Sequence, residues 1–136
     1  MPFMVWNDRL SVGVAAVDAD HKKMVKMINE LYDAILAGSW REKLDGLLDR
    51  LVDYTRYHFA REEELFARTG YPEAEAHKRE HDEMKEWMNS ASNLHRDGSL
   101  PAPSLELMNH LKDWLFDHIL GSDQKFAPHM KAHHIR

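Results

Sequence analysis

The stretch that decides the fold reads LDGLLDRLVDYTRYHFAREEELFARTG and spans residues 44–70. Its apolar side chains recur at steps of three and four residues, which is the spacing of one face of an α-helix. They are Leu44, Leu47, Leu51, Tyr54 and Leu65. His58 and Glu62 fall on the same face, and Gly70 ends the pattern. The stretch therefore predicts a helix over about 41–69 whose inward face carries a histidine and a carboxylate.

Three further segments show the same periodicity, over about 18–37, 72–95 and 104–127. Gly38 ends the segment at 18–37, Pro72 suits the opening of the segment at 72–95, and Ser104 suits the N-cap of the segment at 104–127. A turn-forming run precedes Ser104 and contains Asp97, Gly98, Ser99, Pro101 and Pro103. Short connections make neighbouring helices antiparallel. We therefore expect an all-α fold, an antiparallel up-down-up-down four-helix bundle with an extended N-terminal arm at 1–17, in one domain over 1–136.

Composition and charge argue against several classes of protein. The 136 residues include 18 Lys and Arg against 23 Asp and Glu, so the formal net charge is -5 and a nucleic-acid partner is not expected. Cysteine is absent, so any metal must be held by nitrogen and oxygen, and a reducing compartment is favoured. Asn7, Asp8 and Arg9 interrupt the N-terminal stretch, which therefore does not resemble a secretion signal. No run approaches the roughly 20 apolar residues of a membrane span, so we expect a cytoplasmic protein.

Histidine is the unusual residue, with ten in the chain. Those that share the inward helix faces with Glu62 are His21, His58, His77, His81 and His118. In an up-down-up-down bundle, the start of the first helix, the end of the second, the start of the third and the end of the fourth lie at one end. Counting about 1.5 Å per residue from that end places all six side chains in one layer, roughly 6 to 15 Å deep.

Asp123 joins this layer only if the fourth helix is irregular. Five residues after His118, a regular helix has turned by about 500°, so Asp123 would point about 140° away from the layer. Gly121 and Ser122 lie between the two residues. We therefore predict either a π-bulge or an early, loosened helix end that swings Asp123 inward.

A bound cation explains why so many polar donors face the interior. A single buried histidine is more often a hydrogen-bonded core residue than a ligand, but six inward donors at one depth are hard to satisfy by mutual hydrogen bonds. The pairs His58–Glu62 and His77–His81 each present two donors one turn apart, which suits two ions better than one. Five imidazoles, two bridging carboxylates and a bridging oxygen leave one position open on two six-coordinate ions. Such a donor set favours iron, with manganese second.

The motifs that carry these donors resemble those of the hemerythrins, in particular the single-domain bacterial hemerythrins. They are Asp20-His21-Lys22, His58-Phe59-x-x-Glu62, His77-x-x-x-His81 and Trp114-x-x-x-His118-Ile119-x-x-x-Asp123. The resemblance covers essentially the whole chain and implies a non-haem di-iron centre, with a bridging oxo or hydroxo group, that binds dioxygen reversibly. It gives His77, His81 and His118 to one iron, His21 and His58 to the other, and Glu62 and Asp123 to both. The second iron keeps the vacancy.

The resemblance also implies an apolar pocket for dioxygen, although ordinary core packing explains the same side chains. The expected lining residues are Phe59, Trp114, Ile119 and Leu120. Trp6 resembles a family feature that packs the arm across the bundle.

Other polar residues near the motifs have simpler interpretations. The candidate acceptors for ligand imidazoles are Asp18, Glu63 and Asp117, for which solvated surface charges are the simpler explanation. The histidines that match no ligand position, and that we interpret as surface or tail residues, are His95, His110, His129, His133 and His134.

The leading hypothesis is reversible dioxygen binding for storage, delivery or sensing, without catalytic turnover. No second domain is evident, so a signalling output needs a separate protein, and a carrier or local oxygen supply is preferred. A carrier also allows for an unidentified protein client or reductase as partner. The alternatives are a di-iron enzyme acting on oxygen, peroxide or nitric oxide, an iron-storage or metal-binding protein, and a bundle that binds a protein partner and is only stabilised by metal.

Overall fold

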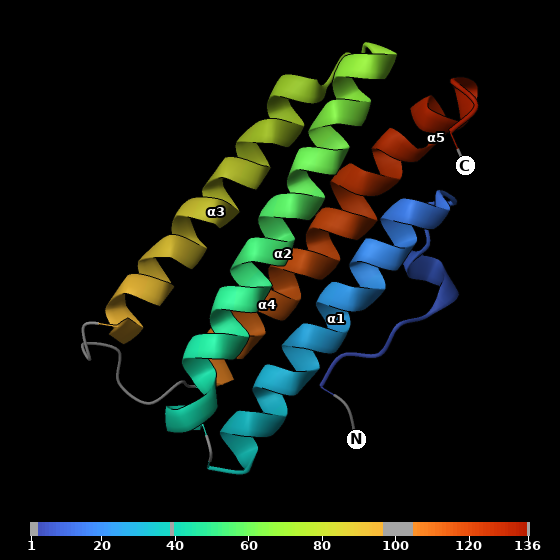
Figure 1. The fold of residues 1–136 in the computed structure, drawn as a ribbon. Coiled ribbons are helices and arrows are strands. Elements are labelled where there is room, and N and C mark those ends of the chain that lie inside the picture. The colour runs from blue at the N-terminus through green and yellow to red at the C-terminus, as the bar shows by residue number, and fades with distance from the viewer. Residues whose placement is uncertain (1–2, 39, 97–104, 136) are drawn as a thin grey trace.

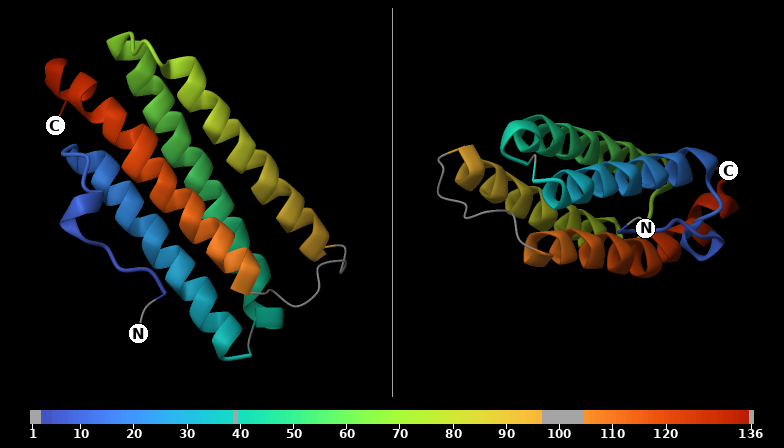
Figure 2. Two further views of the ribbon diagram at one scale, coloured as in Figure 1. Left: turned by 180° about the vertical axis from the view of Figure 1, so that it is seen from behind. Right: turned by 90° about the horizontal axis from the view of Figure 1, so that it is seen from below.

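The computed structural model describes residues 3–38, 40–96 and 105–135. Within them the chain is all-α and forms an antiparallel four-helix bundle (Figure 1). The elements are a 3-10 turn η1 (Asp8–Leu10), α1 (Ala15–Leu36), α2 (Trp40–Thr69), α3 (Ala74–Arg96), α4 (Leu105–His118), a π-helical turn η2 (Ile119–Asp123) and α5 (Gln124–Ala132). Because α4, η2 and α5 follow one another without a break, they form the fourth rod of the bundle. Seen from below in Figure 2, α1 and α2 form one layer and α3 and α4 the other.

Glycines end the first two long helices. Gly38 follows α1 with a φ of 73°, and Gly70 follows α2 with a φ of 61°. This left-handed backbone favours glycine, which has no Cβ. After Gly70, the N–H of Tyr71 donates to the carbonyl oxygen of Phe66 at 3.1 Å and closes the last turn. Both glycines thus act where the sequence pattern places them.

Helix boundaries differ from the sequence pattern at three places. α1 begins at Ala15, before the expected start at Asp18, because the buried Val17 belongs to the helix. Pro72 lies in a turn, and α3 begins only at Ala74. α5 extends to Ala132, beyond the expected end at 127. The turn-forming run at 97–103 and the proposed N-cap Ser104 lie outside the described residues.

Two clusters of buried apolar side chains fill the bundle, one on each side of the histidine layer. The larger one, which we call the bundle core, includes Met24, Leu51, Met84, Met88, Met108 and Leu111. The smaller one, which we call the end cluster, consists of Val12, Val14, Val17, Leu65, Phe66, Phe126, Ala127 and Met130. Along each helix the inward histidines lie between residues of the two clusters, so the layer is enclosed from above and below.

The N-terminal arm packs along the bundle. Backbone N–H of Met4 donates to Oδ1 of Asn29 at 2.8 Å, and Nδ2 of Asn29 donates to the carbonyl oxygen of Met4 at 2.9 Å. Trp6 is partly buried against the bundle core. Asp18 accepts hydrogen bonds from the hydroxyl of Ser11 and from the backbone N–H of Val12. These contacts fix the arm to α1.

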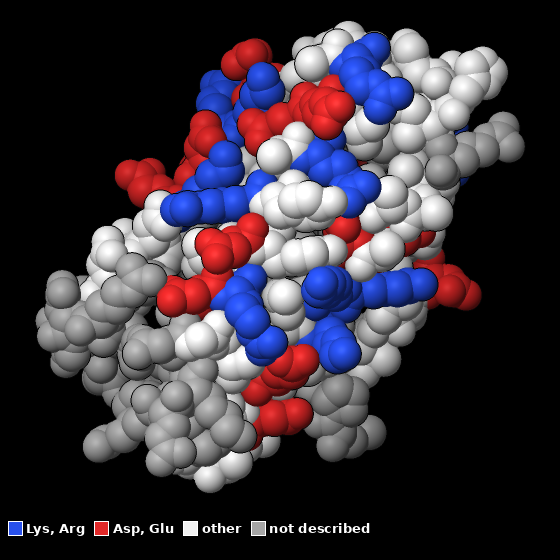
Figure 3. All heavy atoms as spheres, viewed as in Figure 1, with Lys and Arg blue, Asp and Glu red and all other residues white. Residues whose placement is uncertain are grey.

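The surface is mixed in charge. On the face seen in Figure 3, acidic and basic side chains alternate, and none of them forms a large patch of one sign. Ion pairs between helices follow from this mixture, such as that between Nη2 of Arg50 and Oε2 of Glu30 at 3.0 Å. Among the described helices, none has the length and hydropathy to cross a membrane.

Candidate metal centre

The structure brings the seven predicted ligands into one buried cluster. His21 lies on α1, His58 and Glu62 on α2, His77 and His81 on α3, His118 at the end of α4, and Asp123 at the end of η2. None of them is more than 5% exposed. Six ionisable side chains from four helices and a seventh from the π-turn thus share one buried layer.

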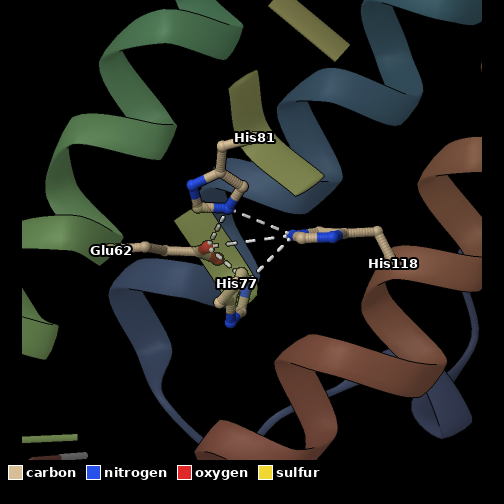
Figure 4. Close-up of side chains that lie close together, drawn as sticks. All are labelled: Glu62, His77, His81 and His118. Carbon is tan, nitrogen blue, oxygen red and sulfur yellow. Dashed lines mark hydrogen bonds and ion pairs between the residues drawn. The ribbon is translucent and has the colours of Figure 1, made fainter. Parts of the chain in front are cut away.

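Three histidines gather around one oxygen of Glu62. The side chains of Glu62, His77, His81 and His118 point toward one another in Figure 4. Nε2 of His118 lies 3.1 Å from Nε2 of His77 and 3.2 Å from Nε2 of His81. Oε2 of Glu62 lies 3.0 Å from Nε2 of His81. We call this set the three-histidine group.

A second set forms beside it around the other oxygen of Glu62. Nε2 of His21 and Nε2 of His58 are 3.0 Å apart. Oε1 of Glu62 lies 2.9 Å from Nε2 of His58, and Oδ2 of Asp123 lies 3.0 Å from Nε2 of His21. We call these four residues the two-histidine group.

Both carboxylates reach both groups. Glu62 directs Oε1 toward His58 and Oε2 toward His81. Asp123 directs Oδ2 toward His21, while its Oδ1 lies 2.9 Å from Nε2 of His77 and 3.1 Å from Nε2 of His118. One oxygen per group is the arrangement that a carboxylate needs to bridge two ions.

The π-helical turn explains why Asp123 faces the cluster. The backbone N–H of Gln124 donates to the carbonyl oxygen of Ile119, five residues earlier, which is the hydrogen bond of a π-helix. This wider turn places residues five apart over one another, so Asp123 lies on the same side as His118. Of the two backbone irregularities predicted from the sequence, the π-bulge is confirmed, and α5 continues after it.

The geometry fits a bound cation better than a network of hydrogen bonds. Both oxygens of Asp123 and Oε2 of Glu62 are buried without a hydrogen-bond partner among the described residues, although imidazole nitrogens approach them closely. The nearby nitrogens therefore do not satisfy these oxygens as hydrogen-bond donors, whereas a cation bound between them would satisfy both. At a metal–nitrogen distance of about 2.1 Å, neighbouring donors around a six-coordinate ion are about 3.0 Å apart, and those around a tetrahedral ion about 3.4 Å. The nitrogen–nitrogen distances of 3.0 to 3.2 Å match the six-coordinate case.

In the metal-free protein the cluster holds protons in place of metal. Burial lowers the pKa of His58, but the charge of Glu62 and the hydrogen bond with Asp20 outweigh it and raise this pKa to about 9. Burial also lowers the pKa of His118, but contact with Asp123 and Glu62 outweighs burial and raises this pKa well above its ordinary value. Burial raises the pKa of Glu62, but the charge of His58 drives it well below its ordinary value. Because protonated imidazoles cannot bind metal, metal uptake must release protons.

Some polar residues that support the ligands escaped the sequence analysis. Nδ1 of His58 is hydrogen-bonded to Oδ2 of Asp20 at 2.9 Å, and Nδ1 of His118 lies 3.2 Å from Oε2 of Glu80. Contact with His118 outweighs burial and lowers the pKa of Glu80 to about 2. Asp20 immediately precedes His21, so it falls off the inward stripe, and periodicity alone gave no signal for it.

The acidic residues that the sequence suggested as acceptors for ligand imidazoles do not accept hydrogen bonds from them. Asp18 holds the arm, as described above. Oε2 of Glu63 lies 3.8 Å from Nδ1 of His81, which is too long for a hydrogen bond. Asp117 is exposed.

Aromatic and aliphatic side chains close around the cluster. Phe59 and Ile119 are completely buried. The ring of Phe59 stacks on His81 with centroids 3.9 Å apart, and Trp114 stacks on His118 at 4.5 Å. Leu120 differs from our expectation, because it is 46% exposed. Since Ile119 takes the inward position at the start of η2, its neighbour Leu120 turns toward solvent, and we do not retain it as a lining residue.

The remaining histidines lie outside the cluster. His110 is exposed and stacks on Trp87. Nε2 of His129 lies 2.8 Å from the carbonyl oxygen of Thr69, and His133 and His134 are exposed. The side chain of His95 lies outside the described residues.

Comparison with known proteins agrees with this geometry. The chain is 37% identical to a bacteriohemerythrin of Stenotrophomonas maltophilia, over 98% of this chain and 85% of that protein. It is 36% identical to the bacteriohemerythrin of Pseudomonas aeruginosa PAO1, over 93% and 81% of the two chains. A crystal structure of wild-type hemerythrin superposes with a TM-score of 0.87 at 29% identity, covering 93% of this chain and 96% of that chain. The profile of the hemerythrin HHE cation binding domain matches residues 12–130. The chain therefore belongs to the hemerythrin family.

Proposed function

We propose that this hemerythrin binds dioxygen reversibly at a pair of iron ions. The proposed ligands are His21, His58, Glu62, His77, His81, His118 and Asp123. The observation that carries the proposal is the unequal number of donors in the two groups. Three imidazole nitrogens and two carboxylate oxygens converge in the three-histidine group, but only two of each converge in the other. If both ions also share one bridging oxygen, the two-histidine group is left with the open position.

The residues of the chain create the conditions for reversible binding. When bound, a pair of ferrous ions supplies the two electrons that reduce dioxygen reversibly. Glu62 and Asp123 bring two negative charges into the layer, and each of these carboxylates directs one of its oxygens toward each group. Because Phe59 and Ile119 are fully buried beside the ligands, they keep out the water and protons that would make the reduction irreversible.

An apolar cavity in the bundle core supports dioxygen as the ligand. Its volume is about 20 Å³, which is enough for a molecule the size of water or dioxygen. The lining residues are Met24, Ile28, Leu51, Thr55, Met84, Met88, Leu111, Trp114 and Leu115. Met24 follows His21 by three residues on α1, and Thr55 precedes His58 by three residues on α2, so the cavity lies about one helical turn from the two-histidine group. Dioxygen is apolar, so it enters such a space more readily than water.

The same cavity favours a carrier over an enzyme. Its described lining contains no acid or base and only one hydroxyl, that of Thr55. Turnover of dioxygen or peroxide needs a supply of protons, which this lining does not offer. We therefore propose storage or delivery of oxygen as the role, with sensing as the variant that needs a partner protein.

Anaerobic reconstitution tests the proposal. The metal-free protein is titrated with ferrous iron, and optical spectra are followed through cycles of oxygen and argon. We expect two irons per chain and a spectrum that returns after each cycle. His58→Ala should abolish the oxygen-dependent change, whereas His110→Ala, at an exposed histidine outside the cluster, should preserve it. Steady consumption of reductant with no stable oxygenated form would instead identify an enzyme.

A further inference from the structure

A hydrogen-bonded network lies behind His58, on the side of the ring that faces away from the cluster. Nδ1 of His58 is 2.9 Å from Oδ2 of Asp20 and donates to it, because an ionised carboxylate only accepts. The hydroxyl of Tyr54 donates to Oδ1 of Asp20 at 2.8 Å. Nε of Arg61 lies 2.9 Å from Oδ2 of Asp20. Asp20 is only 3% exposed, so its charge acts in a poorly screened environment.

Among the described residues, no other ligand imidazole has a buried carboxylate at hydrogen-bonding distance from its Nδ1. Nδ1 of His21 and Nδ1 of His77 are buried without a hydrogen-bond partner. Nδ1 of His81 is too far from Glu63 for a hydrogen bond. His118 has Glu80 as its neighbour, but the side chain of Glu80 is 45% exposed and its charge is screened by water. The buried carboxylate thus acts on one histidine of the two-histidine group.

The chemistry of this contact has a direction. A carboxylate that accepts the Nδ1–H of a histidine fixes the ring and makes its Nε2 a stronger electron donor. A stronger donor favours the more highly charged state of a bound ion. Tyr54 and Arg61 oppose this effect, because both draw negative charge away from Asp20. The strength of His58 as a ligand is therefore a balance between Asp20 and these two partners.

We propose that Asp20 is a positioning residue that fixes His58 and, in balance with Tyr54 and Arg61, sets the reduction potential of iron in the two-histidine group. This inference rests on the proposed function, because it requires iron in that group. It assigns the open coordination position to the ion whose ferric state is stabilised by a buried carboxylate.

Two substitutions with opposite expected effects test the proposal. Asp20→Asn keeps an oxygen that can accept from Nδ1 of His58 but removes the charge, so the reduction potential should rise. Tyr54→Phe removes a donor to Asp20 and strengthens its charge, so the potential should fall. A tenfold change in the relative affinity for ferric and ferrous iron corresponds to about 59 mV, and we expect shifts of this size. Both are measured by redox titration of the iron-loaded protein.

A surface substitution provides the matched control. Glu30 and Arg50 form an ion pair between α1 and α2, as Asp20 and Arg61 do, but their side chains are 40% and 59% exposed. Glu30→Gln removes the same charge from the same helix and should leave the potential unchanged. If Asp20→Asn and Tyr54→Phe shift the potential in the same direction, or neither shifts it, Asp20 has only a structural role.

A measurement with cobalt separates this inference from the proposed function. Asp20→Ala removes the acceptor altogether, so the affinity for cobalt(II) should fall about 10- to 100-fold, whereas Asp20→Asn should keep most of it. Wild-type protein that takes up cobalt at two sites but fails to bind dioxygen when iron-loaded would contradict the proposed function alone. Wild-type protein that binds dioxygen, with Asp20→Ala equal to wild type in cobalt affinity, would contradict the inference alone. Protein that binds no metal overturns both.

Discussion

The orientation of Asp123 depends on one extra residue in the π-turn, so removing that residue tests the geometry of the centre. Asp123 follows His118 by five residues and faces the cluster only because η2 is π-helical. Deleting Gly121 shortens the separation to four residues, and a regular α-helix then turns by about 400°, which leaves the carboxylate about 40° from the direction of His118. Inserting an alanine after Ser122 lengthens it to six, which points the carboxylate about 120° away. Gly121 is suited to deletion, because it is exposed and lies between the two ligands without contributing a side chain to the cluster.

We expect the deletion variant to keep both metal ions and the insertion variant to lose at least one. Asp123 lies within 3.1 Å of Nε2 of His21, His77 and His118, so its loss removes a donor from both groups. Loss of a residue that only supports a ligand costs about 10- to 100-fold in metal affinity, so loss of this shared donor should cost at least about 100-fold. The measurement is an anaerobic titration with cobalt(II) or ferrous iron, with circular dichroism to check the helical content.

Asp123→Ala provides the control for this experiment. The insertion also rotates Phe126 and the rest of α5, which lowers stability, whereas Asp123→Ala removes only the carboxylate. Both variants should show the same loss of metal affinity. The reasoning is refuted if the deletion variant stays folded but releases both ions, or if the insertion variant binds metal as tightly as wild type.

Three further outcomes follow from the structure. In metal-free protein, the pKa of His58 is raised from 6.5 to about 9. The stability that protonated His58 contributes is therefore complete below pH 6.5 and is lost as the pH rises through 9. The free energy of unfolding, measured in urea with a chelator present, should fall over that window. Gly13→Ala should lower stability by about 1 to 2 kcal/mol, because Gly13 has a φ of 75° and the new Cβ would lie 2.6 Å from the side chain of Lys131. Gly46→Ala, in open space on α2, should instead raise stability by about 0.5 to 1 kcal/mol. Thermal unfolding measures both effects. Phe59→Ala should cost about 3 to 5 kcal/mol and speed the loss of the oxygenated spectrum, since Phe59 is fully buried against His81.

The helical bundle and the metal-binding layer could be predicted because both depend on periodicity along single helices. The inward positions of His58 and Glu62 follow from their spacing, and their common depth with His77 follows from antiparallel packing. The irregular backbone before Asp123 could also be anticipated, because Asp123 follows His118 by five residues and a regular helix would point it about 140° away from the layer.

Contacts that depend on how two helices are rotated against each other could not be predicted in the same way. Asp20 lies about 100° from His21 on α1, and it reaches His58 only because α2 presents the back of that ring to it. For Asp20 the missing information is an angle between elements, which no single stripe of residues contains. Leu120 was misplaced for a different reason, because the family resemblance alone suggested it. Two residues after His118 a helix has turned by about 200°, which directs Leu120 away from the layer and leaves it 46% exposed.

The arrangement of the two apolar clusters explains how the centre can be both buried and loaded with metal. The bundle core packs residues of α1, α2, α3 and α4 mainly on one side of the layer, and Phe59 within it stacks on the ligand His81. The end cluster closes the other side and depends on Phe126 and Met130 of α5, whose orientation is set by the same π-turn that presents Asp123. Without metal, the charges that Glu62 and Asp123 bring into the layer are balanced only by protonated histidines, which repel one another. The end cluster is therefore the part of the fold that we expect to open first when metal is absent, which gives ions a path to the layer while the bundle core keeps the histidines in register.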